Sequence, residues 1–341
     1  MNINGVGIVF NRGRGIKSLE NALAEGWKKP ENDCYKIPEE IFSDPVIMRN
    51  MRRADNLSKM TVLAALDALN DGGLLEEDKE SLGIILATAF GPHPTTFKFL
   101  DDIIEYGDKN ASPTTFSHSV HNAAISYASI IIQNRGPTLT ITQFVESFYQ
   151  ALILAESWLI EERCKNILVG VADEYGEVMR YICNKKLNIA RDGKIKPFLF
   201  SKTPEVVPGE GSVFFLISKT EKAKYASIKF SCEIDKGNEV DLCVLDSDGM
   251  TGSEEYYLKL TKNYNYFASY TPLFGSILTG SAFSCLVSVL MIKNQKIYAS
   301  PVTYNPYKIN LCDKTETRKL NIISCVKYDC SGEKIEFFVT K

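Results

Sequence analysis

The sequence has few of the residues on which metal binding and acid–base chemistry depend. Its 341 residues include three histidines, His93, His118 and His121, and none follows residue 121. The nine cysteines are dispersed, and no two form a Cys-x-x-Cys pair. A zinc site needs clustered cysteine and histidine ligands, so no metal site is predicted. The Gly-Glu-Gly run at 209–211 matches neither a P-loop nor a dinucleotide-binding fingerprint, so we read it as a turn and predict no cofactor.

The sequence also lacks a long apolar run and a strong excess of charge. No uninterrupted apolar stretch reaches the roughly 18 residues of a membrane span. The best candidate, residues 282–292, contains Ser284, Cys285 and Ser288 and predicts a buried helix. The first residues lack the pattern of a secretory signal, and a net charge of -3 gives no electrostatic case for nucleic acid or an anionic membrane. We therefore expect a cytoplasmic protein with reduced thiols, several of them buried.

Apolar strands alternate with helices along the whole chain. Residues 51–73 predict a helix that Asp55 or Asn56 caps and Gly72-Gly73 ends. Residues 81–90 form a continuous apolar strand, and threonines alternate with apolar residues in the next strand, 138–144. A helical run and the strand 166–172 follow, which makes a strand–helix–strand unit and implies a parallel sheet. Further strands are predicted at 212–218, 228–234 and 240–246 and in the C-terminal tail, with an apolar helix at 280–292.

Six segments of the chain, taken in order, carry a resemblance to a known family: 51–74, 117–137, 138–159, 167–174, 208–218 and 272–297. They resemble the β-ketoacyl synthases of fatty-acid and polyketide assembly, and the resemblance covers nearly the whole chain. The Phe-Ser-His-Ser-Val-His-Asn run at 116–122, together with Glu-Ser-Phe at 146–148, more narrowly resembles a divergent group found beside pigment and aryl-polyene assembly genes, which often lacks the nucleophile.

The resemblance implies an α/β, thiolase-like fold of five layers, αβαβα, built from two related halves. The N-terminal half would span residues 1–218 and the C-terminal half residues 219–341. Proteins of this family are usually dimers. The strand 138–144 would then pair with its copy across the dimer axis.

Decarboxylative condensation needs a thiolate, activated at a helix N-terminus, and two imidazoles that stabilise developing charge. The resemblance places the nucleophile at Val145, and an offset of one or two residues still gives no cysteine. It places the two histidines at Asp248 and Ser276, and the lysine that usually precedes the second at Thr271. Because no histidine lies in the second half, neither can be present. Valine cannot form an acyl-enzyme, so acyl transfer through this position is excluded.

The remaining pocket candidates all have alternative structural roles. Phe144 and Glu146 flank the nucleophile position, and Glu146 could fill the vacated pocket. Ser147 could act as a nucleophile only if His121 served as its base. The other candidates are Asn122, which follows His121 where the family faces the pocket, and Cys330, which takes the place of the family's oxyanion loop.

The sequence therefore predicts a ketosynthase-like protein that does not condense. By resemblance, it would act as a chain-length-factor-like partner of an active β-ketoacyl-acyl-carrier-protein synthase, in fatty-acid, polyketide or aryl-polyene biosynthesis. Its partners would be an acyl carrier protein and a catalytic subunit in a heterodimer. Two alternatives stay open: a homodimer that binds an acyl chain or carrier protein, and an acyltransferase that uses Ser147 and His121.

Overall fold

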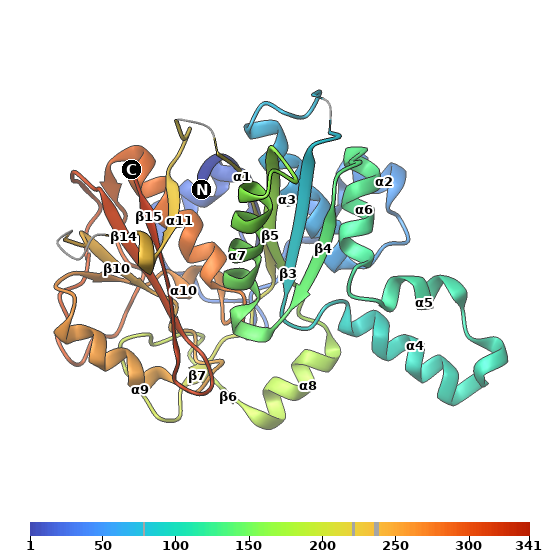
Figure 1. Ribbon diagram of the computed structural model, residues 1–341. Coiled ribbons are helices and arrows are strands. Elements are labelled where there is room, and N and C mark those ends of the chain that lie inside the picture. Colours follow the sequence, from blue (N-terminus) through green and yellow to red (C-terminus); the bar gives the residue numbers. More distant parts are fainter. Residues whose placement is uncertain (78, 220–221, 235–238) are drawn as a thin grey trace.

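The computed structural model describes residues 1–77, 79–219, 222–234 and 239–341 (Figure 1). Ten of its strands form two sets of five, joined in one sheet. The first set has the spatial order β1-β8-β5-β3-β4 and the second β9-β15-β14-β10-β11. The first set comprises β1 (Asn2–Phe10), β3 (Leu82–Thr88), β4 (Thr138–Thr142), β5 (Asn166–Asp173) and β8 (Gly211–Ser218), and the second β9 (Ser227–Phe230), β10 (Leu242–Leu245), β11 (Phe267–Ala268), β14 (Ile322–Tyr328) and β15 (Lys334–Thr340).

The two sets repeat one topology. In each, the first strand in the chain pairs antiparallel with the last, the last pairs antiparallel with the fourth, and the remaining neighbours are parallel. The sets meet where Asn2 of β1 pairs with Ser227 of β9. The prediction of two related α/β halves is therefore confirmed at the level of the strands. The division at residue 218 falls between the sets and stays a prediction as a domain boundary.

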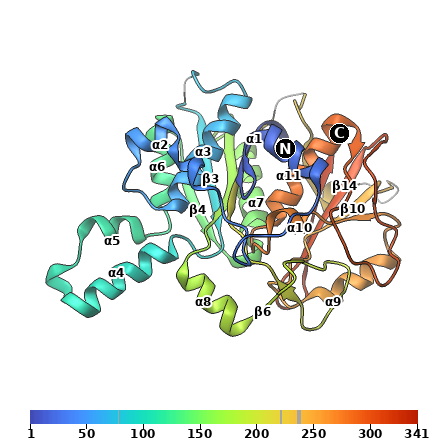
Figure 2. The same ribbon diagram turned by 180° about the vertical axis from the view of Figure 1, so that it is seen from behind.

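Helices cover the sheet in layers (Figures 1 and 2). The helices α3 (Asn56–Asp71) and α6 (Ala123–Ile132) pack on the outer face of the first strand set. The helices α7 (Ser147–Ile160) and α11 (Ser281–Asn294) share one large apolar core with strands of both sets. Every residue of α11 from Ser281 to Ile292 is buried, as its apolar sequence predicts.

The outer layer over the second strand set is much thinner. It consists of the four-residue helix α9 (Glu254–Tyr257) and a 3-10 turn at Leu258–Lys262, with Phe198 and Phe200 packed beside them. The connection from β9 to β10 has only eleven residues, 231–241, so it is shorter than the 16-residue α3 alone. The predicted five layers are present, with the last one reduced.

The remaining helices and strands complete the described chain. The helices α4 (His93–Tyr106) and α5 (Pro113–Ser119) form an arm that extends away from the body beyond β4 (Figures 1 and 2). The remaining helices are α1 (Gly15–Glu25), α2 (Pro45–Asn50), α8 (Glu177–Lys186) and α10 (Thr271–Phe274), and the remaining strands are β2 (Gly13–Arg14), β6 (Asn188–Ile189), β7 (Glu205–Val206), β12 (Lys296–Ile297) and β13 (Glu316–Thr317).

Five predicted elements are shorter than expected. The strand predicted over 81–90 spans Leu82–Thr88, and the strand predicted over 240–246 spans Leu242–Leu245. The helix predicted over 51–73 begins at Asn56, because the Asp55 side chain accepts a hydrogen bond from the Ser58 amide at 2.6 Å. The strand predicted over 138–144 ends at Thr142, and the strand predicted over 228–234 ends at Phe230. In both cases a 3-10 turn follows.

Two further expectations concern membrane-spanning helices and the burial of the cysteine side chains. Within the described ranges, no helix has both the length and the hydrophobicity needed to span a bilayer. Six of the nine cysteines are buried, which confirms that several thiols lie in the interior.

Candidate functional site

The turn between β4 and α7 carries the predicted nucleophile position. Phe144 adopts a φ of 47°, in a region that residues other than glycine rarely occupy. Such strain costs on the order of 1–3 kcal/mol and persists where the surrounding structure enforces it. A strained strand-to-helix turn is also the backbone device that presents a nucleophile in other enzymes. Here the residue at the tip is a phenylalanine, which is 58% exposed and packs against Phe90 with ring centroids 5.5 Å apart.

Val145, the next residue, points inward instead. It is 4% exposed and packs in an apolar cluster with Ala89, Leu278 and Ile335. Ala89 follows β3 in the first half, whereas Leu278 and Ile335 belong to the second half. The predicted nucleophile position is therefore an apolar contact between the halves.

The two polar residues after Val145 do not form a reactive group. The hydroxyl of Ser147 is buried, accepts a hydrogen bond from the Gln143 amide at 2.8 Å, and lies 3.0 Å from the Thr88 carbonyl oxygen. These two contacts of the Ser147 hydroxyl therefore link the turn to the end of β3. Glu146 does not fill a pocket, because its carboxylate accepts hydrogen bonds at the surface from the side chains of Gln143 (3.0 Å) and Gln150 (3.4 Å).

Asp248 and Ser276, the predicted histidine positions, lie in contact with each other. The Ser276 hydroxyl donates to the Asp248 carbonyl oxygen at 2.5 Å and accepts from the Val207 amide at 3.1 Å. Both residues are buried. The structure thus brings the two second-half positions together, as a hydrogen-bonded support for the loops that carry them. Thr271, where the family's lysine would fall, bonds to the Ser269 hydroxyl at 3.1 Å.

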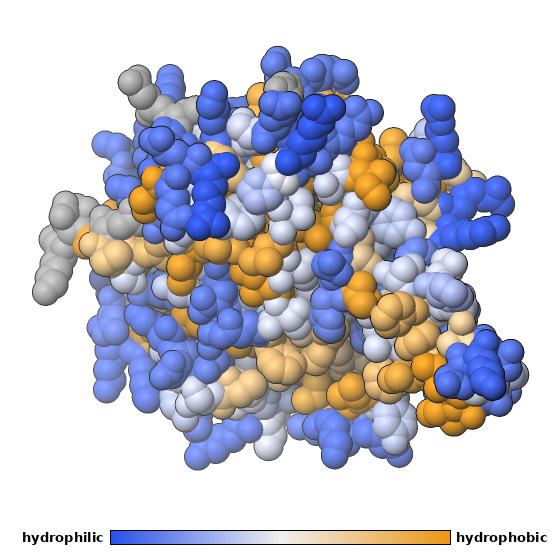
Figure 3. Space-filling view, turned by 45° about the vertical axis from the view of Figure 1, so that its right-hand side comes forward, coloured by the Kyte–Doolittle hydropathy of each residue, from blue (hydrophilic) through white to orange (hydrophobic). Residues whose placement is uncertain are grey.

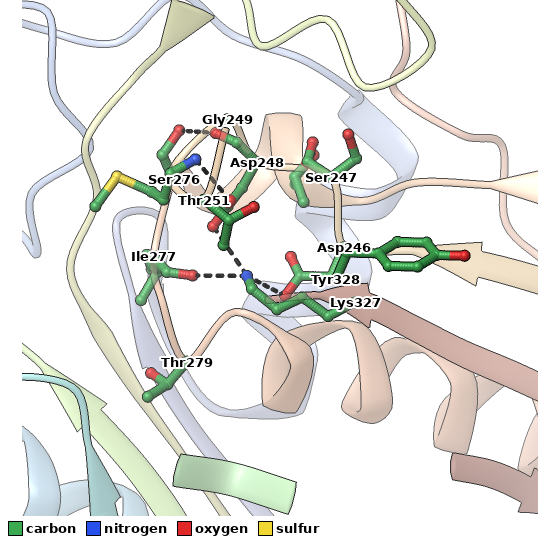
Figure 4. A network of polar contacts seen from close by, with 12 residues as sticks. Asp246, Ser247, Asp248, Gly249, Thr251, Ser276, Ile277, Thr279, Lys327 and Tyr328 are labelled. Carbon is green, nitrogen blue, oxygen red and sulfur yellow. Dashed lines mark hydrogen bonds and ion pairs between the residues drawn. The ribbon is translucent and has the colours of Figure 1, made fainter. Parts of the chain in front are cut away.

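Lys327, for which no role was predicted from the sequence, lies at the centre of the region around Asp248 and Ser276 (Figure 4). The Lys327 ammonium group donates to the carboxylates of Asp246 at 2.7 Å and Asp248 at 3.1 Å, and lies 3.4 Å from the Ile277 carbonyl oxygen. The side chains of Lys327, Asp246 and Asp248 are each 1% exposed. We call these three residues the ion cluster.

The surroundings shift the pKa values of Asp246 and Lys327 in the same direction, which disfavours the charge on Asp246 and favours the charge on Lys327. Burial raises the pKa of Asp246 above its usual value, whereas Lys327 acts to lower it. Burial would lower the pKa of Lys327, but the two aspartates more than offset this and leave its pKa raised. The Asp246 carboxylate also lies against Gly280 at the start of α11, where a side chain on residue 280 would come within 2.8 Å of it. A helix N-terminus stabilises such an anion.

Two more carboxylates lie near the ion cluster, and of these Glu254 is buried and Asp173 is half-buried. Glu254 accepts a hydrogen bond from the Gly249 amide at 2.8 Å, and burial raises its pKa to about 7. Asp173, at the end of β5, accepts from the Ala89 amide at 2.8 Å and from the Thr279 hydroxyl at 2.7 Å. It thereby ties the first half to the second-half loop, and burial raises its pKa.

The space between these groups is almost entirely filled. A cavity of about 20 Å³ remains between Phe90, Met250, Ser276 and Leu278. This volume accommodates about one water molecule. A cavity of this size has no room for an acyl chain. The Cys183 thiol also lines this cavity, and burial raises the pKa of this thiol to about 11.

The other candidates lie outside this contact. His121 and Asn122 are exposed in the turn between α5 and α6, where the His121 ring packs on Gly91. No described hydrogen bond joins His121 to Ser147, so the geometry does not form the pair that an acyltransferase would need. Cys330 is exposed in the turn between β14 and β15. Across the described ranges, no group of three or more potential metal ligands gathers.

Glu210, in the Gly-Glu-Gly run, acts as a turn residue. Its carboxylate accepts hydrogen bonds from the backbone amides of Ile37 at 2.9 Å and Tyr175 at 3.0 Å. The carboxylate therefore holds two loops near the site, and each of its two oxygens already accepts a hydrogen bond from one of these backbone amides.

Comparisons with known proteins agree with this architecture. Residues 26–179 match the family model described as "Beta-ketoacyl synthase, N-terminal domain", which spans just under half of the chain. No curated protein sequence matches the chain. The matched residues include the β4–α7 turn.

Solved structures match over nearly the whole chain. A β-ketoacyl synthase from Burkholderia phymatum STM815 is 13% identical, with a TM-score of 0.77 and coverage of 100% of this chain and 98% of that one. The ishigamide ketosynthase/chain length factor is 14% identical, with a TM-score of 0.78 and the same coverage. A type II polyketide synthase ketosynthase, solved in complex with its acyl-carrier protein, is 12% identical, with a TM-score of 0.76 and coverage of 99% and 98%. These matches confirm the predicted α/β, thiolase-like fold.

Proposed function

We propose that this chain is a ketosynthase-like subunit that does not condense and that acts as a chain-length-factor-like partner of an active β-ketoacyl synthase. The observation that carries the proposal is the filled site. Val145 packs in an apolar contact, and Lys327 forms buried ion pairs with Asp246 and Asp248 where the chemistry would otherwise occur. A fold retained without its reactive groups is suited to a supporting role in an assembly.

The edge strand β4 supports the pairing part of the proposal. β4 ends the strand order of the sheet and pairs on one side only, with β3. Leu139 on this strand is 44% exposed, and Phe144 just beyond it is also exposed. An exposed edge strand offers unpaired backbone groups to a second subunit. One of the structural matches is itself named as a ketosynthase/chain length factor.

A basic cleft supports an acidic carrier protein as a further partner. Arg49, Arg52 and Arg53 line a cleft of about 360 Å³ together with His118 and Tyr127. In the described part of the chain, none of the three arginines takes part in an ion pair. Such a surface attracts an acidic partner and speeds its association. This cleft is also the observation that favours the second candidate function, a homodimer that binds a carrier protein.

Co-production with a cysteine-bearing ketosynthase encoded in the same genome tests the proposal. We expect a 1:1 complex by native mass spectrometry, and condensation activity that appears or changes its product chain length only when both subunits are present. The variant Leu139→Lys should lose the complex, whereas Lys259→Glu, on the far second half, should keep it. A ketosynthase that forms no complex and makes the same products alone would contradict the proposal, and a carrier-binding homodimer would then be the better account.

A further inference from the structure

Two glutamates lie buried beside the start of α3. Charged side chains normally stay at the surface of a protein, and hydrophilic residues cover much of the face that Figure 3 shows. Glu174, directly after β5, and Glu210, in the Gly-Glu-Gly run, are exceptions, with 9% and 5% of their surface exposed. Buried acidic groups need either partners that stabilise their charge or a proton that removes it.

Asp55 brings a third carboxylate to the same place. It caps α3 by accepting a hydrogen bond from the Ser58 amide at 2.6 Å. The Leu57 amide, one residue earlier in the first turn of α3, donates to the Glu174 carboxylate. Because consecutive amides at a helix N-terminus lie side by side, the carboxylates of Asp55 and Glu174 are neighbours.

Each of these two neighbours has one oxygen left without a donor. Within the described residues, the Oδ2 atom of Asp55 and the Oε1 atom of Glu174 are buried and accept no hydrogen bond. Buried polar atoms are nearly always paired, and two neighbouring carboxylates repel each other when both are ionised. A single proton removes both problems, because a protonated carboxyl group donates a hydrogen bond to a carboxylate.

The surrounding groups decide which carboxyl group carries this proton. Both oxygens of Glu210 accept hydrogen bonds from backbone amides, and the N-terminus of α3 favours the negative charge of Asp55. Burial, followed by the charges of Asp55 and Glu210, raises the pKa of Glu174 well above its usual value. The proton therefore resides on Glu174.

Among the described residues, no cation replaces this proton. Lys36 favours the ionised form of Glu174, but it is exposed, and its effect is smaller than that of the Leu57 amide. Tyr127, which faces Asp55 from α6, is an uncharged phenol whose pKa is raised by burial and by Asp55. Arg52 and Arg53 precede Asp55 in the chain and line the basic cleft.

We propose that Asp55 and Glu174 share one proton, which the Glu174 carboxyl group donates to the Asp55 carboxylate, and that this hydrogen bond fixes the first turn of α3. Loss of the proton leaves two adjacent anions. The first turn, and the arginine segment 49–53 before it, therefore loosen as pH rises. The pair is a pH-sensitive latch for the segment that lines the basic cleft, and it does not depend on the partner in the proposed function.

Infrared spectroscopy of the purified chain tests for the proton directly. At neutral pH, we expect the difference spectrum between the wild type and Glu174→Gln to contain the carbonyl band of a protonated carboxylic acid. Glu177→Gln, at an exposed position nearby, should give no such band. In an Asp55→Asn background the neighbouring charge is gone, so the band should disappear at a lower pH than in the wild type.

Hydrogen exchange measures the latch itself. Opening of the first turn of α3 returns Glu174 to its ordinary pKa, so each opening releases one proton. After correction for the intrinsic pH dependence of exchange, opening of residues 56–60 should increase by about tenfold per pH unit between the ordinary pKa of Glu174 and its raised one. Glu174→Gln, whose side-chain amide donates to Asp55 at every pH, should show no such increase, whereas Glu177→Gln should behave as the wild type.

Three outcomes would overturn the latch. The first is the absence of the carboxylic-acid band, and the second is the same pH dependence of exchange in Glu174→Gln and the wild type. The third is protection by millimolar Mg²⁺ in the wild type but not in Glu174→Gln, because a metal ion would then occupy the site. If Glu174→Gln does not fold, exchange in the wild type and in Asp55→Asn still tests the latch, since residue 55 is only half-buried and its variant should show the weaker pH dependence. A chain that shows the latch but ignores the ketosynthase would contradict the proposed function alone.

Discussion

The two sides of the filled site are held together by different interactions. On the first-half side, the strained β4–α7 turn keeps its backbone shape, but Val145 presents an apolar side chain to Ala89 and Leu278. On the second-half side, polar groups remain, but Lys327 neutralises Asp246 and Asp248 in buried ion pairs. The comparison teaches that one contact between the two halves can combine apolar packing on one side with charge pairing on the other.

The two sides should differ in how much stability depends on them. Apolar packing tolerates substitutions of similar volume at a cost below about 1.5 kcal/mol. Removal of one partner from a buried ion pair costs about 3–5 kcal/mol, because the other charge is left uncompensated. Single substitutions on the ionic side should therefore have the larger effects.

The largest expected effect follows the substitution Lys327→Met. It leaves Asp246 and Asp248 buried without their cation, so the free energy of unfolding should fall by about 3–5 kcal/mol in urea titrations. Lys334→Met, on the same hairpin, removes a half-exposed pair with Glu336 and should cost about 1 kcal/mol or less. The triple variant K327M/D246N/D248N should recover part of the loss. Equal losses for Lys327→Met and Lys334→Met would show that the ion cluster does not stabilise the fold.

The second-largest expected effect is the change of stability with pH. The pKa of Glu254 is about 7 in the folded chain against 4.5 for the free side chain. Between about pH 4.5 and 7, Glu254 loses its proton in the unfolded chain but keeps it in the folded chain. The free energy of unfolding should therefore fall as pH rises through this range, by about 1–3 kcal/mol. Thermal unfolding across this range would measure the slope. Glu254→Gln should make it shallower, and an unchanged slope in that variant would assign it to other groups.

A smaller effect is expected on the first-half side from Ser147→Ala. The substitution leaves the Gln143 amide without its side-chain acceptor and removes the buried hydrogen bond to the Thr88 carbonyl oxygen, so the turn should lose about 1–2 kcal/mol of stability. Ser157→Ala, at an exposed position on the same helix, serves as the control and should be nearly neutral. If the two variants were equally stable, Ser147 would not be needed to hold the strained turn.

The smallest effect on stability should come from Val145→Cys. The side chains are close in volume, so the cost should stay below about 1.5 kcal/mol. The variant should form no β-ketoacyl product from malonyl and acyl thioesters, because no imidazole stabilises the developing charge. Robust condensation by this single variant would mean that the second half retains a reactive group outside the ion cluster.

Strand and helix patterning predicts most of the fold. The continuous apolar run of β3 identifies this strand because all of its residues are buried. The alternation of threonine with leucine and isoleucine identifies β4 through its period of two and its β-branched residues, although none of its residues is buried. The ends of β4 and β9 are missed, since a 3-10 turn continues each strand without a change in composition. The outer layer of the second half is thin because only eleven residues connect β9 to β10, fewer than α3 alone contains. The length of this connection could therefore have predicted the thin layer from the sequence.

The site is less predictable. The positive φ of Phe144 has no signal in sequence, since phenylalanine is a poor residue for that conformation. Lys327 did leave a signal: it shares the inward face of β14 with Ile323 and Cys325, where the alternation calls for an apolar residue. A lysine on a buried face implies nearby carboxylates. Their identity as Asp246 and Asp248 required the contact between β10 and β14.

Intact-mass analysis tests the absence of acyl transfer most directly. The purified chain would be incubated with acyl and malonyl thioesters of coenzyme A and of a carrier protein, with an active ketosynthase as the positive control. We expect the mass of the chain to stay unchanged and no β-ketoacyl product to form, while the control gains an acyl adduct. A covalent acyl adduct on this chain, or product formed by it alone, would contradict the account.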